Sequence, residues 1–185
     1  MGLIIWLTGY PNSGKTTLAE KLIQSIKENL NIIPVWIDGD SIRKIFNVSK
    51  NQTEEERIEL GLKYVRFAKE FYNQGHLVIV STVAIYKQVY DELFSSDRQF
   101  IEIFFVDAAL EKRLERDIFK KIYQNRTNLG IDINNLPVSI KILENNSLKD
   151  LAKNLIFLES FIKEKLFISN NVITKLEEFS NEEKV

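Results

Sequence analysis

The chain has 185 residues, of which 44% are hydrophobic and 28% are charged, and its formal net charge is −1. These values are ordinary for one globular domain, and they exclude a global positive field that would hold nucleic acid nonspecifically. The absence of cysteine and the single histidine exclude disulfides, thiolate chemistry and metal sites built from several histidines. Because no apolar run approaches about 20 residues and the N-terminus predicts a strand rather than a signal peptide, we expect a cytoplasmic protein without membrane association.

Five short apolar segments predict the strands of one sheet. They lie at Leu3–Leu7, Ile33–Ile37, Leu77–Ser81, Phe100–Val106 and, with a weaker pattern, Ser139–Leu143. The first four are almost continuously apolar, which is typical of strands that are covered on both faces in a parallel sheet. Trp6 and Trp36 fall within these segments, and we expect both in the core.

Helical periodicity separates the strand segments. The predicted helices are Lys15–Leu30, Thr53–Asn73, Tyr86–Ser95, Ala109–Asn125 and Leu148–Lys165. In the second helix, Thr53 and Glu56 form a capping-box pattern, and a buried stripe is predicted at Leu60, Tyr64, Phe67, Ala68 and Phe71. The alternation predicts a three-layer α/β/α fold with a central, mostly parallel five-stranded sheet. We expect one domain over residues 1–166 and a tail, or a frayed helix, over residues 167–185.

The segment from Gly9 to Thr16 matches the phosphate-binding pattern G-x-x-x-x-G-K-[ST] at every fixed position. It follows a predicted strand and opens a predicted helix, which is the context that the motif needs. Glycines let successive backbone N–H groups point at phosphate oxygens, Lys15 supplies a positive charge, and the Thr16 hydroxyl is a ligand for Mg²⁺. The motif predicts ATP binding by Gly9, Asn12, Ser13, Gly14, Lys15, Thr16 and Thr17.

Two carboxylates follow the second predicted strand, at Asp38 and Asp40. Ligands of open α/β sheets bind at this carboxyl edge, beside the phosphate loop. A carboxylate there holds a magnesium-bound water or takes the proton from an attacking hydroxyl. Arg43 lies a few residues further on and is suited to a forked contact with a phosphate or sulfate of the acceptor. The sequence leaves open which of the two aspartates is the base.

With these motifs the sequence resembles the adenylylsulfate kinase family of P-loop kinases. The resemblance spans about residues 2–165, and the matching segments are Ile5–Thr17, Asp38–Arg43, Phe100–Ala108, Arg116–Asp117, Tyr123 and Gly130–Asp132. Members of the family use MgATP to phosphorylate the ribose 3′-hydroxyl of adenosine 5′-phosphosulfate. The resemblance therefore implies that activity, with ATP as co-substrate, Mg²⁺ as cofactor and a small nucleotide as acceptor.

The resemblance also implies roles for single residues. Lys15, Asp38 and Asp40 would be catalytic, Thr16 and Asp38 would contact Mg²⁺, and Arg116 would reach ATP from the helix that leads into a lid at about residues 118–137. The acceptor would be bound by Asp40, Arg43, Phe46, Arg57, Ser81 and Lys87.

The acceptor side departs from the family pattern. Where the family shows Arg-Glu-Glu-Asn-x-x-Arg, the stretch from Arg57 to Lys63 has lost the asparagine, and the second arginine is absent or replaced by lysine. Where the family shows Ser-x-x-Ser-Pro-x-Arg, this chain has Ala84 and Lys87 at the second serine and the arginine. Lysine does not make the planar, two-pronged contact that arginine makes to sulfate or phosphate. Another activated nucleotide, such as the cytidine diphosphoramidate that some relatives phosphorylate, is therefore an alternative acceptor.

Two further alternatives stay open, an RNA-linked or tRNA-linked kinase and a nucleotide-binding module without catalysis. The basic residues between Lys112 and Lys121 are interleaved with acidic ones, and Arg113 and Asp117 have the spacing of a helical ion pair. We therefore interpret this stretch, apart from Arg116, as a solvated helix face, and we do not expect a nucleic acid partner. The oligomeric state is open, with a homodimer among the alternatives.

Overall fold

A computed structural model describes residues 2–48, 52–84, 86–95, 100–117 and 140–182, with the backbone alone from residue 168. Five strands form one sheet: β1 (Leu3–Thr8), β2 (Val35–Asp38), β3 (Leu77–Ser81), β4 (Ile101–Asp107) and β5 (Lys141–Glu144). Their order is β2-β3-β1-β4-β5, and every pair of neighbours is parallel. The predicted parallel five-stranded sheet is confirmed.

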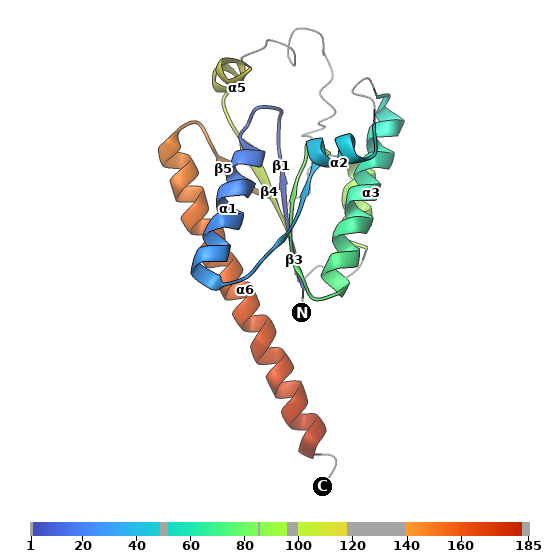
Figure 1. The fold of residues 1–185 in the computed structure, drawn as a ribbon, viewed down its shortest axis with the longest axis vertical. Coiled ribbons are helices and arrows are strands. Elements are labelled where there is room, and N and C mark those ends of the chain that lie inside the picture. Colours follow the sequence, from blue (N-terminus) through green and yellow to red (C-terminus); the bar gives the residue numbers. More distant parts are fainter. Residues whose placement is uncertain (1, 49–51, 85, 96–99, 118–139, 183–185) are drawn as a thin grey trace.

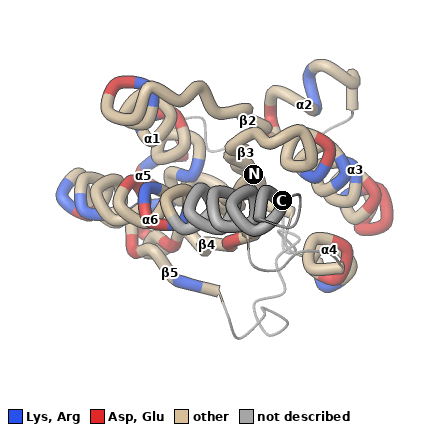
Figure 2. The backbone as a smooth tube through the Cα atoms, turned by 90° about the horizontal axis from the view of Figure 1, so that it is seen from below, with Lys and Arg blue, Asp and Glu red and all other residues tan. Residues whose placement is uncertain are grey.

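Helices cover the sheet on both faces (Figures 1 and 2). On one face lie α1 (Lys15–Leu30) and α6 (Leu148–Glu182), and on the other lie α3 (Glu54–Asn73) and α4 (Lys87–Leu93). Two short helices, α2 (Gly39–Ile45) and α5 (Leu110–Arg116), lie at the carboxyl edge of the strands. This arrangement confirms the three-layer α/β/α fold. Among the described residues there is no helix that is both long enough and apolar enough to cross a membrane.

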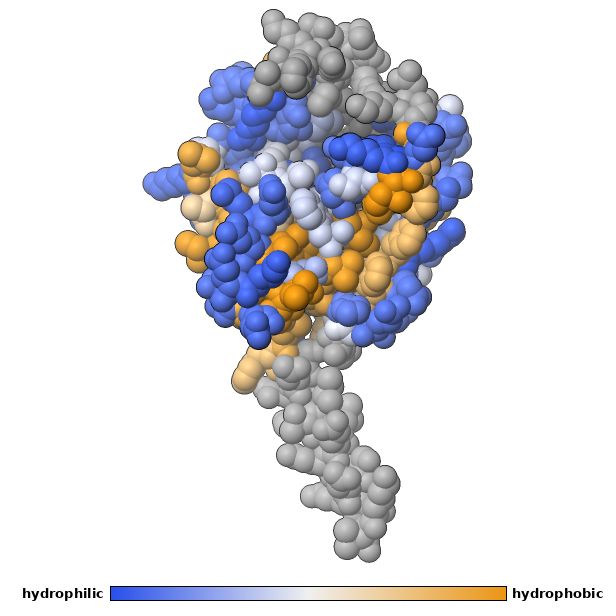
Figure 3. All heavy atoms as spheres, in the orientation of Figure 1, coloured by the Kyte–Doolittle hydropathy of each residue, from blue (hydrophilic) through white to orange (hydrophobic). Residues whose placement is uncertain are grey.

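The core is centred on β1, whose six residues are all buried. Trp6 is fully buried, as predicted. The prediction for Trp36 is wrong, because β2 is an edge strand and leaves 39% of that side chain exposed. The strand also begins two residues later than predicted, at Val35, and Ile33 is 77% exposed. On the side of the molecule where β2 lies at the surface, hydrophobic residues lie between the hydrophilic outer surfaces of the two helix layers (Figure 3).

Helix ends agree in part with the sequence. The capping box at α3 is present, since Glu56 N donates to Thr53 Oγ1 (3.3 Å) and Thr53 N donates to Glu56 Oε2 (2.8 Å). The buried stripe on α3 is correct for Leu60, Tyr64 and Ala68, whereas Phe67 is 39% exposed.

The bounds of α3 and α4 agree with the prediction to within two residues, whereas α2, α5 and α6 differ more. The helix α6 continues to Glu182, so the boundary expected after residue 166 falls inside it. No glycine or proline follows Lys165 to end the helix. The helix α5 ends at Arg116, and the rest of the predicted helix and the predicted lid lie outside the described residues. The helix α2 was not predicted, because its segment was interpreted only as two carboxylates and an arginine after a strand.

A carboxylate on α6 ties this helix to α1. Glu159 Oε2 accepts a hydrogen bond from Ser25 Oγ and another from Asn29 Nδ2 (3.1 Å), and Glu159 Oε1 accepts one from Lys163 Nζ (2.8 Å). These hydrogen bonds favour the charged form, first of all the bond from Lys163 and next the bond from Ser25, and they lower the pKa of Glu159 to about 2. The ionised carboxylate of Glu159 therefore contributes to the stability of the fold.

Replacing Glu159 with glutamine is expected to lower the free energy of unfolding by about 1–2 kcal/mol at pH 7, because hydrogen bonds to a charged group are lost. The stabilisation by a carboxyl group with a lowered pKa is complete above its ordinary pKa, near 4.5, and is lost as the pH falls toward 2. The difference between wild type and variant should therefore shrink between pH 5 and pH 3 in urea unfolding followed by circular dichroism. The exposed Glu28 provides a matched control (Glu28→Gln), and a difference that does not change with pH would contradict this account.

Candidate active site

The phosphate loop connects β1 to α1 with an unusual backbone. Gly9 and Gly14 have φ angles of 144° and 94°, and Asn12 has a φ of 60°. A Cβ atom on Gly9 would lie 2.2 Å from the carbonyl oxygen of Val106, so only glycine fits that position. The loop ends where α1 begins, and the free N–H groups of the first helical turn make this point attractive to anions.

Lys15 is buried in this loop, with 7% of the residue exposed. Its ammonium nitrogen donates to the carbonyl oxygen of Tyr10 (2.6 Å) and to Ser13 Oγ (3.5 Å). Burial lowers the pKa of Lys15 to about 7, although the nearby carboxylates of Asp40 and Asp38 act in the opposite direction. The phosphate groups of a bound nucleotide would favour the charged form, so this lysine is suited to bind an anion.

Asp38 joins the phosphate loop to the end of β2. Its Oδ1 atom caps α2 by accepting from the backbone N–H groups of Asp40 (3.1 Å) and Ser41 (3.0 Å). Its Oδ2 atom accepts from Thr16 Oγ1 (3.3 Å) and Ser81 Oγ (2.9 Å). The hydroxyl of Thr16 and the carboxylate of Asp38 thus present adjacent oxygen atoms. Magnesium in nucleotide sites prefers this donor set, with few protein ligands and the remaining positions filled by phosphate and water, so these residues fit Mg²⁺.

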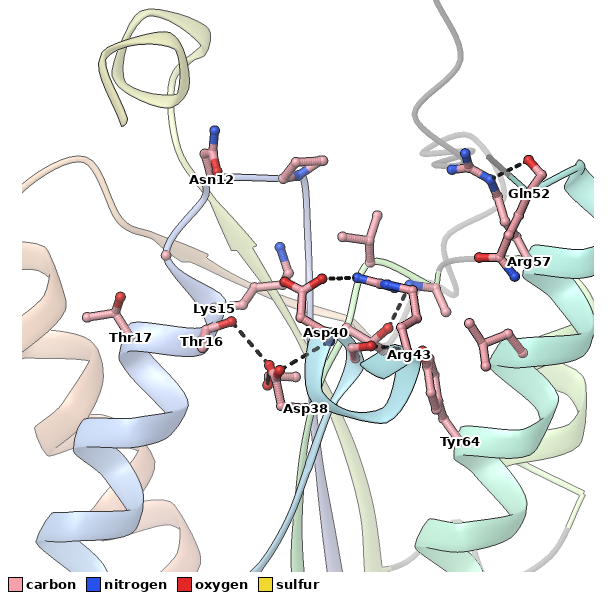
Figure 4. A pocket seen from close by; sticks show the side chains of 18 of the residues that line it. Asn12, Lys15, Thr16, Thr17, Asp38, Asp40, Arg43, Gln52, Arg57 and Tyr64 are labelled. Atoms are coloured by element: carbon pink, nitrogen blue, oxygen red, sulfur yellow. Dashed lines mark hydrogen bonds and ion pairs between the residues drawn. The ribbon is translucent and has the colours of Figure 1, made fainter. Parts of the chain in front are cut away.

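The other wall of the site comes from α2 and α3. Arg43 forms an ion pair with Asp40, whose side chain is 71% exposed. Tyr64 donates from its hydroxyl to the carbonyl oxygen of Gly39 (3.2 Å), which ties α3 to the start of α2. Arg57 donates through Nε to the carbonyl oxygen of Gln52 (3.2 Å) (Figure 4).

One cavity of about 640 Å³ joins these two walls (Figure 4). The predicted site residues that line it are Asn12, Gly14, Lys15, Thr16, Thr17, Asp38, Asp40, Arg43, Arg57, Ser81 and Arg116. Gly9 and Ser13 belong to the loop itself and do not line the cavity. Phe46 and Lys87, predicted at the acceptor, do not line it either: Phe46 packs against Phe67, and Lys87 is 68% exposed and pairs with Asp91.

Arg116 and Asn145 contact the phosphate loop from the side of β4 and β5. Arg116 donates to the carbonyl oxygens of Asn12 and Ser13 (both 3.3 Å) and of Asn145 (2.8 Å). Asn145 is buried just after β5, and its Nδ2 donates to the carbonyl oxygen of Ser13 (2.7 Å). The sequence analysis missed Asn145. The rule that site residues follow the carboxyl ends of parallel strands, already applied at Asp38, would have pointed to it.

Replacing Asn145 with alanine is expected to raise the KM for ATP about 3- to 10-fold with a smaller change in kcat, because one hydrogen bond that holds the loop is removed. Steady-state kinetics at saturating acceptor would measure both constants. The exposed Asn73, at the end of α3, gives the matched control (Asn73→Ala). Equal KM values for Asn145→Ala and wild type would mean that Arg116 and the loop backbone hold the loop in its binding conformation without Asn145.

Arg113 is the exception to the interpretation of α5 as a solvated face, which the ion pair of Lys112 and Glu115 fits, with side chains 44% and 62% exposed. Arg113 is only 9% exposed, and its guanidinium carbon lies 4.0 Å from the centre of the Tyr10 ring. Its Nε donates to the carbonyl oxygen of Ala108 (2.9 Å), and its own carbonyl oxygen accepts from Asn12 Nδ2 (3.4 Å). The helix α5 packs against the phosphate loop with the side that carries Arg113, and that side is buried. Alternation of charges along the sequence does not reveal such a contact.

The chain is similar in sequence to known kinases. A model of the adenylylsulphate kinase family matches residues 1–136. The cytidine diphosphoramidate kinase of Campylobacter jejuni is 33% identical over 129 residues, which cover 70% of this chain and 74% of that protein. A probable adenylyl-sulfate kinase of Pyrococcus abyssi is 34% identical over 116 residues, which cover 63% of this chain and 66% of that protein.

A solved structure agrees in fold. The APS kinase of Mycobacterium tuberculosis, solved in complex with AMPPNP and APS, superposes with a TM-score of 0.67 at 22% identity, covering 85% of this chain and 96% of that one. The family match covers well over half of the chain and includes the phosphate loop, Asp38 and the wall formed by α2 and α3. The chain therefore belongs to the adenylylsulphate kinase family and is a nucleotide kinase.

Proposed function

We propose that this kinase transfers the γ-phosphoryl group of ATP to a ribose hydroxyl of an activated nucleotide, and that cytidine diphosphoramidate is the first candidate for that acceptor. The observation that carries the proposal is the single cavity that joins the phosphate loop to Arg57 across Asp38 and Asp40. A donor nucleotide on the loop and an acceptor beside Arg57 would meet at the two aspartates. Such a juxtaposition suits an in-line displacement, in which positioning and charge stabilisation supply most of the catalysis.

The donor half of the cavity provides positive charge and backbone donors. The loop and the start of α1 would hold the phosphates, and Lys15 would stabilise the charge that develops on the transferred group. Thr16 and Asp38 would hold Mg²⁺, which when bound neutralises phosphate charge. Arg116 lines the cavity at the loop and would keep the loop in its binding conformation.

The acceptor half lacks three hydrogen-bonding side chains of the family pattern, although Arg43, Arg57 and Tyr64 remain in its lining. Leu60 and Ala84 line the cavity at positions where the family pattern has asparagine and serine, and neither side chain forms hydrogen bonds. Lys87, which stands in place of the arginine, is outside the cavity and pairs with Asp91. A sulfate group accepts hydrogen bonds at all its oxygen atoms, whereas the terminal group of a phosphoramidate carries N–H donors. The arginine only donates, so its loss removes a partner for sulfate oxygens and favours the phosphoramidate. The Campylobacter relative acts on such an acceptor by its name.

Adenosine 5′-phosphosulfate is the second candidate. The family model and the Pyrococcus relative favour it, and Arg57 and Arg43 in the cavity suit its phosphate and sulfate. The two acceptors carry similar charge, so overall electrostatics do not separate them. They differ in base and in the terminal group.

The test is ADP release from MgATP with each acceptor in parallel, and with CDP and AMP as controls that lack the activated terminal group. We expect kcat/KM for cytidine diphosphoramidate to exceed that for adenosine 5′-phosphosulfate by at least about 10-fold, the worth of one or two hydrogen bonds. A preference for adenosine 5′-phosphosulfate would overturn the order of the candidates. Activity on neither would overturn both.

The assignment of Arg57 to the acceptor is tested separately. Arg57→Ala should raise the KM for the acceptor about 10- to 100-fold and leave the KM for ATP unchanged, because a charged hydrogen-bond donor is lost from the acceptor half alone. Arg66, exposed on the same helix, gives the matched control (Arg66→Ala). A rise in the KM for ATP of the same size would place Arg57 with the donor instead.

A further inference from the structure

Trp36 has a polar contact that its place on an edge strand does not require. The side chain is 39% exposed and does not line the cavity. In the register of the sheet Trp36 pairs with Ile79, yet its indole N–H reaches diagonally to Ser81 Oγ, at 3.0 Å. The contact links the outer edge of the sheet to the carboxyl ends of β2 and β3, where the active site lies.

Ser81 links Trp36 to Asp38 through a second hydrogen bond. The serine is buried, with 3% exposed, and its hydroxyl donates to Asp38 Oδ2 at 2.9 Å. An indole N–H only donates and an ionised carboxylate only accepts. The orientation of the Ser81 hydroxyl is therefore fixed at both ends: its lone pair faces Trp36 and its proton faces Asp38.

The same oxygen of Asp38 faces the phosphate loop. Oδ2 also accepts from Thr16 Oγ1 (3.3 Å), while Oδ1 is held by two backbone N–H groups of α2. The backbone N–H groups of α2 hold Oδ1 in place, and the Ser81 hydroxyl holds Oδ2. Oδ2 therefore lies next to the Thr16 hydroxyl, which would bind the magnesium ion of a bound nucleotide.

We propose that Ser81 and Trp36 are positioning residues that hold Asp38 Oδ2 beside Thr16, so that the pair is arranged for Mg²⁺ before the nucleotide binds. Trp36 acts only through Ser81, and Ser81 acts on the carboxylate. Groups that orient the ligands of a metal commonly affect its affinity about 10- to 100-fold. The inference concerns ATP and Mg²⁺ alone, so it does not depend on the identity of the acceptor.

The test measures the dissociation constant of ATP by calorimetry, once with excess Mg²⁺ and once with EDTA. The ratio of the two constants reports how much Mg²⁺ strengthens binding. We expect Ser81→Ala to reduce this ratio about 10-fold and Trp36→Phe to reduce it about 3-fold, with the constant in EDTA unchanged for both. The double variant should equal Ser81→Ala alone, because without the hydroxyl the indole N–H has no route to Asp38.

Three results would overturn the proposal. The first is an effect of Trp36→Phe that persists in the Ser81→Ala background, since this would indicate packing rather than a relay. The second is a loss of ATP affinity by Ser81→Ala that is equal in Mg²⁺ and in EDTA, and the third is no change in the ratio for Ser81→Ala. Ser160→Ala, at an exposed position of α6, is the matched control, and thermal unfolding of each variant shows that the fold is retained. None of these measurements needs an acceptor, so failure of the proposed acceptor would leave them unaffected.

Discussion

Replacement of Lys15 by methionine is expected to lower kcat/KM for ATP by about 1,000-fold or more. The two side chains have similar length, but methionine has no charge and no donor to offer the phosphates. Removal of a single preorganised donor costs about 100- to 1,000-fold in many enzymes, and here a full positive charge in a buried loop is lost as well. Steady-state kinetics and calorimetric titration with ATP would measure the loss in turnover and in binding.

The pH dependence of stability shows whether the variant is folded and whether the charge of Lys15 is buried. In the unfolded chain this lysine keeps its proton up to its ordinary pKa of 10.5, whereas in the fold its pKa is about 7. Between these values the unfolded state binds more protons, so the stability of wild type should rise with pH relative to Lys15→Met. Lys21→Met, at an exposed position of the same helix, should show neither effect. Near wild-type turnover in Lys15→Met would contradict the role of Lys15 at the phosphates.

Local patterns predict the phosphate loop and its place between a strand and a helix. The loop from Gly9 to Thr16 is contiguous in sequence, and the requirement for glycine at two positions and for a strand before and a helix after is visible without a structure. The buried strands are equally local, because continuous apolar runs mark them. The sheet, its parallel pairing and the position of the loop could therefore be predicted.

The rest depends on contacts between distant segments. Trp36 and Trp6 have the same local pattern, yet one lies on an edge strand and the other in the centre, and strand order alone decides this. Arg113 is buried because α5 packs against the phosphate loop and Tyr10. Asn145 contacts Ser13 across 132 positions of the chain. No pattern of residues within one segment encodes such contacts.

Asp38 and Asp40 looked alike in the sequence, but the structure separates them. Asp38 is 7% exposed and accepts four hydrogen bonds, whereas Asp40 is largely exposed and pairs with Arg43. Four donors hold both oxygens of Asp38 in place, and one of them is the hydroxyl of Thr16. We therefore propose that Asp38 holds Mg²⁺ and its water, and that Asp40, which is exposed and lines the cavity, takes the proton from an acceptor hydroxyl.

Substitution of each aspartate by asparagine should consequently give two different losses. In Asp38→Asn an amide N–H₂ would face groups that are themselves donors, so we expect kcat to fall about 1,000-fold and ATP binding in Mg²⁺ to weaken. In Asp40→Asn the loss of a general base would lower kcat about 100-fold and leave MgATP binding unchanged. Turnover measured beside calorimetric titration with MgATP distinguishes the two patterns. If Asp40→Asn kept nearly full turnover while Asp38→Asn bound MgATP as tightly as wild type, the roles would be reversed: Asp38 would be the base, and its hydrogen bonds would have to rearrange when the acceptor binds.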